Sequence, residues 1–263
     1  MSLKAGSGAL VLLALSAVAE WSLRGSAPTT LAAPASAVGA APAVEKTALS
    51  ANAIAELARA FTGSIEGRVR KKDVYGAGVV VNARGHVLTC WHLVDGLEPL
   101  QVRFADGESV AAKVVDRDAG LDVALLELAT PRREFARLGS VAALRAGDEV
   151  FAMGTPRKMR FSLSRGMLSY AGREFEGVRY LQTDLPMSGG SSGGPVLDAG
   201  GALIGIASFV LRDTAGMGFA LPIDYALRRF RRTLEHQPDE LAFERWLSSG
   251  DPSAGEGSRR RPN

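Results

Sequence analysis

The chain has 263 residues, of which 46% are hydrophobic, and its formal net charge is only +3. This composition excludes wholesale disorder and suffices for one large all-β domain or two small ones. Arginines gather at residues 228–232 and 259–261 without an interleaved aromatic patch. They predict a solvated helix face and a frayed tail, so we expect no nucleic-acid partner.

The first 48 residues are typical of an export signal followed by a spacer. Lys4 precedes an apolar run at residues 9–19 that ends in an A-x-A site, which is the layout of a secretory signal peptide over residues 1–19. We expect cleavage before Glu20, and an uncleaved membrane anchor is the alternative. Residues 20–48, rich in Ala and Pro, predict a linker. Both alternatives place the remaining chain outside the cytoplasm.

A helix and then many short strands are predicted after the linker. Apolar residues at helical spacing predict a short helix over residues 49–61. Two groups of strands with Gly, Asn and Asp turns follow, over about residues 61–130 and about 146–222. Many short strands at close spacing indicate an all-β fold, and two groups indicate two barrels packed side by side.

The end of the chain returns to a helical pattern. Residues 224–235 carry an apolar stripe opposite the arginines, with Asp224 as the expected N-cap. The folded domain is therefore expected to span residues 49–236. A second short helix and a disordered tail are predicted over residues 237–263.

The cysteine and histidine content bears on metals and disulfides. Cys90 is the only cysteine, so the chain forms no intramolecular disulfide. His86, His92 and His236 are spread along the chain, which predicts no metal-ligand cluster, no bound metal and no cofactor. We expect Cys90, two residues before His92, to be a buried packing residue.

Three short segments carry residue types suited to nucleophilic catalysis. His92 follows a strand in L-T-C-W-H-L-V, Asp122 begins an apolar strand in L-D-V-A-L-L, and Ser192 lies in the turn G-S-S-G-G-P. A serine hydroxyl becomes a good nucleophile when an imidazole takes its proton, and a carboxylate fixes the tautomer of that imidazole. The turn could instead be a phosphate-binding nest, but that needs a following helix, and residues 195–197 predict a strand.

In the order His, Asp, Ser, these segments resemble the trypsin-like serine proteases, and more closely the HtrA/Deg group of bacterial envelope proteases. The group's histidine follows L-T-x-x-H, its aspartate begins D-[LI]-A-[VL]-L, and its serine lies in G-x-S-G-G-P after Q-T-D. The first and third patterns are present here, D-V-A-L-L at residues 122–126 matches the second except for valine in place of Leu or Ile, and residues 203–206 and 218–222 match the group's closing strands. The resemblance covers residues 61–234. It implies a chymotrypsin-like fold of two antiparallel six-stranded barrels with a C-terminal helix.

The resemblance also implies roles for single residues. His92 would be the general base and then the acid, Asp122 its orienting carboxylate, and Ser192 the nucleophile. The backbone N–H groups of Gly190 and Ser192 would form the oxyanion hole. The neighbouring Ser191 does not fit the S-G-G-P pattern, so Ser192 is preferred.

Asp116 and Asp118 are rival acids, but both precede the apolar strand in what is predicted to be a loop. Asp122 is therefore the preferred acid. Ser191 and Gly189 take the places where the group usually has Asn and Pro, so we expect a more mobile oxyanion loop. Digestive trypsin-like enzymes have an aspartate immediately before the nucleophile that binds a freed N-terminus on activation. Ser191 takes that place here, so we do not expect activation by this route.

By analogy, the substrate pocket is walled by Met187, Ser208, Phe209 and Val210. No acid occupies these positions, so the sequence predicts cleavage of unfolded or extended polypeptides after small or medium apolar residues. The resemblance further implies a periplasmic or envelope location. We expect no PDZ domain after residue 236, and a homo-trimer is an assembly that the sequence leaves open. A peptide-binding holdase with little turnover is the alternative function.

Overall fold

The computed structural model describes residues 48–70, 72–155, 161–187, 190–210, 216–235 and 240–248. All of these residues belong to one unit, Glu45–Asn263. The predicted signal segment, most of the predicted linker and the predicted disordered tail lie outside the described residues. Among the helices that are described, none has the length and apolar character needed to cross a membrane.

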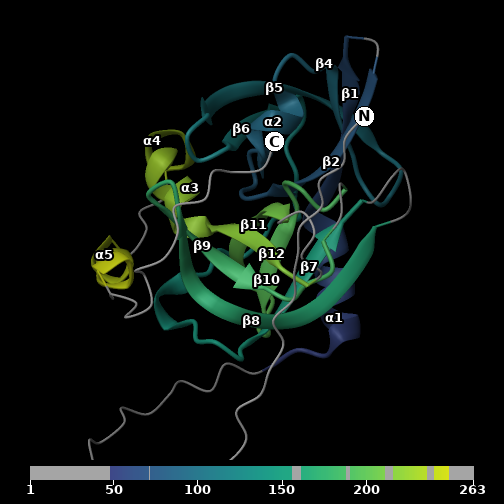
Figure 1. Ribbon diagram of the computed structural model, residues 1–263. Helices are drawn as coiled ribbons and strands as arrows, with labels where there is room; N and C mark the ends of the chain where they lie inside the picture. The colour runs from purple at the N-terminus through teal and green to yellow at the C-terminus, as the bar shows by residue number, and fades with distance from the viewer. Residues whose placement is uncertain are drawn as a thin grey trace, which may run out of the picture. The chain divides into compact units, whose positions relative to one another are not determined.

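Six antiparallel strands close into a first barrel (blue to teal in Figure 1), in the order β1-β2-β3-β6-β5-β4. Its strands are β1 (Thr62–Val69), β2 (Lys72–Val80), β3 (His86–Thr89), β4 (Glu98–Arg103), β5 (Ser109–Asp118) and β6 (Val123–Leu128). All four residues of β3 are buried. Strand β3 pairs with both β2 and β6, so the segment before His92 is held on both sides.

Six further antiparallel strands close into a second barrel, in the order β10-β11-β12-β9-β8-β7. Its strands are β7 (Glu149–Gly154), β8 (Ser162–Phe175), β9 (Val178–Thr183), β10 (Pro195–Asp198), β11 (Leu203–Val210) and β12 (Gly218–Pro222). Strand β8 is the longest of the second barrel and runs without a break over 14 residues. The two closed six-stranded barrels confirm the predicted fold class.

An aromatic cluster supports the second barrel next to the end of β11. The rings of Phe209 and Phe219 stack with their centroids 4.9 Å apart. Phe175 and Tyr180 meet Phe209 edge-on at 5.6 and 5.1 Å. Edge-to-face and offset arrangements are the favourable ones for aromatic pairs. Phe209 is thereby fixed on the strand that borders the serine turn.

Helices cover the ends of the barrels. Helix α1 (Ala51–Phe61) begins at Ser50, whose hydroxyl accepts a hydrogen bond from the Ala53 N–H at 3.2 Å. The helix buries Ile54, Ala58 and Phe61 and packs against β1 and β7. It therefore joins the two barrels.

The predicted helix over residues 224–235 is two helices, α3 (Ile223–Arg229) and α4 (Arg231–Leu234). The prediction that Asp224 is the N-cap is wrong, because Pro222 holds that position. Asp224 is only 1% exposed, and its carboxylate accepts hydrogen bonds from the Ser140 hydroxyl and the Val141 N–H, both at 3.1 Å. The carboxylate thus links α3 to the connection between the barrels. Beyond α4, helix α5 (Glu240–Ser248) packs Phe243 onto Trp246.

Candidate active site

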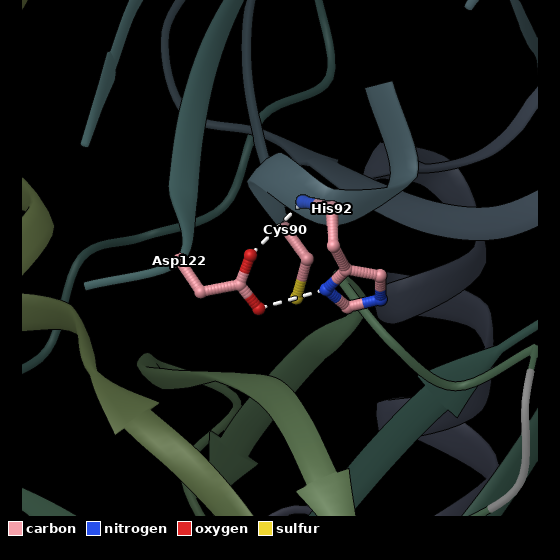
Figure 2. A group of neighbouring side chains, drawn as sticks. All are labelled: Cys90, His92 and Asp122. Atoms are coloured by element: carbon pink, nitrogen blue, oxygen red, sulfur yellow. Dashed lines mark hydrogen bonds and ion pairs between the residues drawn. The ribbon is translucent and has the colours of Figure 1, made fainter. Parts of the chain in front are cut away.

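His92 and Asp122 form a hydrogen-bonded pair at the rim of the first barrel (Figure 2). His92 lies in α2 (Trp91–Val94), the single helical turn that follows β3, and Asp122 directly precedes β6. The distance between His92 Nδ1 and Asp122 Oδ2 is 2.7 Å, and the His92 N–H donates to Asp122 Oδ1 at 2.9 Å. A carboxylate can only accept, so Nδ1 carries the proton and Nε2 of the neutral ring is left as a base.

The backbone of Asp122 is held in a rare conformation. Its φ is +53°, in the left-handed region that costs a non-glycine residue about 1–2 kcal/mol. In this conformation the Asp122 carbonyl accepts the Trp91 N–H at 3.2 Å while its carboxylate binds His92. Strained backbone of this kind often lies at functional sites, where the surrounding contacts enforce it.

The rival acids Asp116 and Asp118 lie in a different network. Both carboxylates bind Arg229 of α3, with N–O distances of 2.9 Å to Asp116 and 3.1 Å to Asp118. These hydrogen bonds, chiefly those with Asp116, raise the pKa of Arg229. Asp118 Oδ1 also accepts the Leu121 N–H at 3.0 Å. The ion pairs of Arg229 with Asp116 and Asp118 therefore steady the segment that leads into Asp122, and neither acid is placed to orient His92.

Ser192 lies in a turn that backbone hydrogen bonds fasten to both barrels. The Gly190 carbonyl accepts a hydrogen bond from the N–H of Thr155, next to β7 of the second barrel, at 2.9 Å. The Ser192 carbonyl accepts one from the N–H of Ala77, in β2 of the first barrel, also at 2.9 Å. Among the described residues, the N–H groups of Gly190 and Ser192 donate to no acceptor. Unpaired backbone N–H groups are uncommon in folded proteins, and these two are the predicted oxyanion donors.

Gly193 connects the serine turn to the end of β3, just before His92. Its φ is +81°, and a Cβ there would lie less than 3.0 Å from the Ala77 carbonyl oxygen and from Thr89 Oγ1. Its N–H donates to the Ala207 carbonyl at 2.7 Å, and the Cys90 thiol donates to the same carbonyl at 3.3 Å. The Ala207 carbonyl thus joins the serine turn to the end of β3.

The Ser192 hydroxyl does not meet His92 in this structure. It donates to the Ser208 carbonyl over a long 3.5 Å. No hydrogen bond links Ser192 to His92 in the described part of the chain. Ser208 is the extra residue where the register between β11 and β12 shifts, so its carbonyl is released from regular strand pairing.

A small cavity of about 80 Å³ adjoins Ser192. The four residues predicted to wall the substrate pocket all border it, together with three others: Met187, Ser191, Ser192, Ala207, Ser208, Phe209 and Val210. None of these described lining residues is charged. The Met187 sulfur lies on Gly218, where a Cβ would be only 2.8 Å from Sδ. Met187 therefore limits the size of the cavity.

The prediction that the chain holds no cluster of metal-ligating side chains is wrong. A cysteine Sγ, a histidine nitrogen and a carboxylate oxygen, from Cys90, His92 and Asp122, lie within 4.8 Å of one another. The sequence gives little sign of this cluster because Asp122 is 30 residues from His92. Strand β3 pairs with β6, with Thr89 opposite Ala124, and this pairing brings Asp122 close to Cys90 and His92.

Comparisons with known proteins agree with this architecture. Residues 76–206 match the family described as trypsin-like peptidase domain. Over 166 residues the chain is 32% identical to the probable periplasmic serine endoprotease DegP-like of Pseudomonas savastanoi pv. phaseolicola. The chain carries a trypsin-like peptidase domain of the HtrA/Deg group. The match covers 61% of this chain and 35% of that relative, so the HtrA/Deg-type domain spans about a third of its curated relative's length.

Other relatives support the same assignment for this HtrA/Deg-type domain. Protease Do-like 1, chloroplastic, of Arabidopsis thaliana is 35% identical over 161 residues, which are 57% of this chain and 37% of that protein. Among solved structures, the HtrA-type protease AlgW with tripeptide superposes with a TM-score of 0.65 at 28% identity. That superposition covers 70% of this chain and 63% of the AlgW chain.

Two contributors to the site were not predicted from the HtrA/Deg-type sequence. The Ala207 carbonyl acts through its backbone, and such a role leaves no signal in the side chain. Arg229 was assigned to a solvated helix face, because only the folded chain shows that Asp116 and Asp118 lie opposite it.

Proposed function

We propose that this domain is a serine endopeptidase in which Ser192 is the nucleophile, His92 the general base and Asp122 the residue that orients the base. The observation that carries the proposal is the 2.7 Å hydrogen bond between His92 Nδ1 and Asp122 Oδ2. It leaves Nε2 as the free base of a ring that is 50% exposed. Hydrogen bonds through Ala207 hold the serine turn next to this pair.

In this mechanism the Ser192 Oγ attacks the carbonyl carbon of the scissile bond and its proton passes to His92 Nε2. Asp122 stabilises the resulting imidazolium, and the N–H groups of Gly190 and Ser192 donate to the negative oxygen of the tetrahedral intermediate. His92 then gives the proton to the departing amine. Water, activated by the same base, hydrolyses the acyl-enzyme.

The Ser192 side chain has to turn from the Ser208 carbonyl toward His92 before this step. Its hydrogen bond to that carbonyl is long, at 3.5 Å, so little stabilisation is lost on leaving it. Catalytic hydrogen bonds are commonly loose before substrate binds. An extended substrate that pairs with the edge of β11 would itself compete for the Ser208 carbonyl.

The cavity beside Ser192 supports a preference for a small or medium apolar residue before the scissile bond. Its volume of about 80 Å³ and its uncharged described lining give room for a side chain of a few carbon atoms. The Met187 sulfur against Gly218 restricts deeper entry. A lysine or arginine would be buried there without a carboxylate partner, which is strongly unfavourable.

The proposed setting is the periplasm, and the substrates are unfolded or extended polypeptides. The relatives named periplasmic serine endoproteases support the location, and the predicted signal segment agrees with it. A peptide-binding protein with little turnover is the second candidate. The absence of a Ser192–His92 hydrogen bond among the described residues favours it.

Labelling by a fluorophosphonate tests the proposal, with Ser191→Ala as the matched control for Ser192→Ala. We expect the wild type and Ser191→Ala to be labelled and to cleave casein, and Ser192→Ala to do neither while its thermal melt is nearly unchanged. Lost folding in Ser192→Ala would indicate a structural serine. If the wild type resists the label even with unfolded substrate present, the peptide-binding function is the correct one.

A digest of a peptide library tests the pocket separately. We expect cuts to follow small or medium apolar residues. Cuts mainly after arginine or lysine would contradict the assignment of the cavity as the specificity pocket.

A further inference from the structure

The Cys90 thiol lies beside the catalytic pair (Figure 2). Its Sγ, a nitrogen of His92 and a carboxylate oxygen of Asp122 are all within 4.8 Å of one another. Cys90 is 1% exposed and donates to the Ala207 carbonyl at 3.3 Å. We propose that Cys90, His92 and Asp122 form a zinc-binding site whose occupation reversibly inhibits the peptidase.

The ligand set suits zinc. Zinc takes thiolate sulfur at about 2.3 Å and imidazole nitrogen and carboxylate oxygen at about 2.0–2.2 Å, in tetrahedral geometry. Ligand atoms in such a site lie roughly 3.3–3.6 Å apart. His92 Nδ1 and Asp122 Oδ2, now 2.7 Å apart, would separate by about 0.6 Å or more and the sulfur would approach.

The charges also balance. A thiolate from Cys90 and the carboxylate of Asp122 neutralise one divalent cation, while the imidazole of His92 stays neutral. A thiolate and an imidazole favour zinc over magnesium and calcium, which take oxygen ligands. Three protein ligands leave a fourth position for water, as in exchangeable rather than structural zinc sites. The His92 side chain, 50% exposed, gives the ion a route from solvent.

Binding moves protons in a way that stops catalysis. Zn–S, Zn–N and Zn–O bonds form, the S–H bond of Cys90 breaks, and its proton leaves to solvent. The proton on His92 Nδ1 is displaced and the neutral ring carries it on Nε2 instead. Nε2–H cannot accept the Ser192 proton, so the base is lost without oxidation or reduction. The inhibitory consequence rests on the proposed peptidase function, whereas metal binding does not.

The first measurement is direct binding, with Co²⁺ as the probe in the full chain. We expect a thiolate-to-cobalt charge-transfer absorption in the wild type and in Ser192→Ala, and none in Cys90→Ala. Since Cys90 is the only cysteine, no other residue can give this absorption. Cys90→Ser provides a second variant, of nearly equal volume, should the alanine variant fold poorly. Cobalt binding by the wild type without this absorption would overturn the proposal.

The second measurement is zinc inhibition of fluorophosphonate labelling, with each variant compared with its own rate in metal-free buffer. We expect zinc to inhibit the wild type, magnesium to have no effect, and Cys90→Ala to need at least about tenfold more zinc for half inhibition. Equal zinc sensitivity of the wild type and Cys90→Ala would overturn the site. A wild type that labels in neither condition contradicts the proposed function, and the cobalt absorption still decides the site.

Discussion

Replacing Gly193 with alanine tests how the serine turn is packed against the first barrel. The new Cβ would lie less than 3.0 Å from the Ala77 carbonyl oxygen and Thr89 Oγ1, and 3.1 Å from the Cys90 nitrogen. Two of these neighbours are backbone atoms, which cannot rotate away. The turn and the end of β3 must therefore move apart.

The size of the effect follows from two contributions. A non-glycine residue at the φ of +81° costs about 1–2 kcal/mol. Overpacking in a close-packed interior costs about 1–3 kcal/mol more. Gly107 is the matched control, because its φ is +90° and a Cβ there would meet nothing within 4 Å. Gly107→Ala should show only the first contribution.

Urea unfolding of both variants gives the comparison. We expect Gly193→Ala to lower the free energy of unfolding by about 2–5 kcal/mol and Gly107→Ala by about 1–2 kcal/mol. A shift of about 1 Å in catalytic geometry can reduce a rate about 100-fold, so fluorophosphonate labelling should fall steeply in Gly193→Ala alone. Equal stabilities and equal labelling rates of the two variants would refute this account of the turn.

Two further predictions concern charged groups outside the His92–Asp122 pair. Arg229→Gln removes the ion pair that steadies Asp118 and, through it, the chain segment just before Asp122. We expect the free energy of unfolding to fall by about 1 kcal/mol and fluorophosphonate labelling to slow. A labelling rate equal to that of the wild type would contradict a positioning role for Arg229. Burial lowers the pKa of His86 in the folded protein. Asn82 Nδ2 also donates a hydrogen bond to His86 Nδ1 at 2.9 Å, which favours the neutral ring. In the unfolded chain, the His86 imidazole has its ordinary pKa of about 6.5. The free energy of unfolding should therefore fall as pH drops below about 7 and level off below the folded pKa, and His86→Gln should reduce this dependence in urea titrations at several pH values.

Local patterns along the chain were enough to predict the strands and the motif residues. Alternating and buried apolar runs with glycine turns predict short strands, because period-two patterns suit a pleated sheet. The grouping of those strands predicted two barrels, and the motifs around His92, Asp122 and Ser192 indicated the family. These patterns involve residues close together in the sequence, so they can be recognised without knowledge of the fold. The resemblance to that family, in turn, predicted the uncharged residues that border the cavity, among them Met187.

Which of these groups lie in contact depends on the folded chain. Strand pairing across 30 residues brings Asp122 to His92 at 2.7 Å, and the same pairing places Cys90 beside them. The role of Asp224 as a buried link rather than an N-cap depends on a partner 83 residues away in sequence. Such contacts combine groups that have no shared local pattern, and backbone groups such as the Ala207 carbonyl leave no trace in the sequence at all. The physical reason is that hydrogen bonding and burial depend on distance in space.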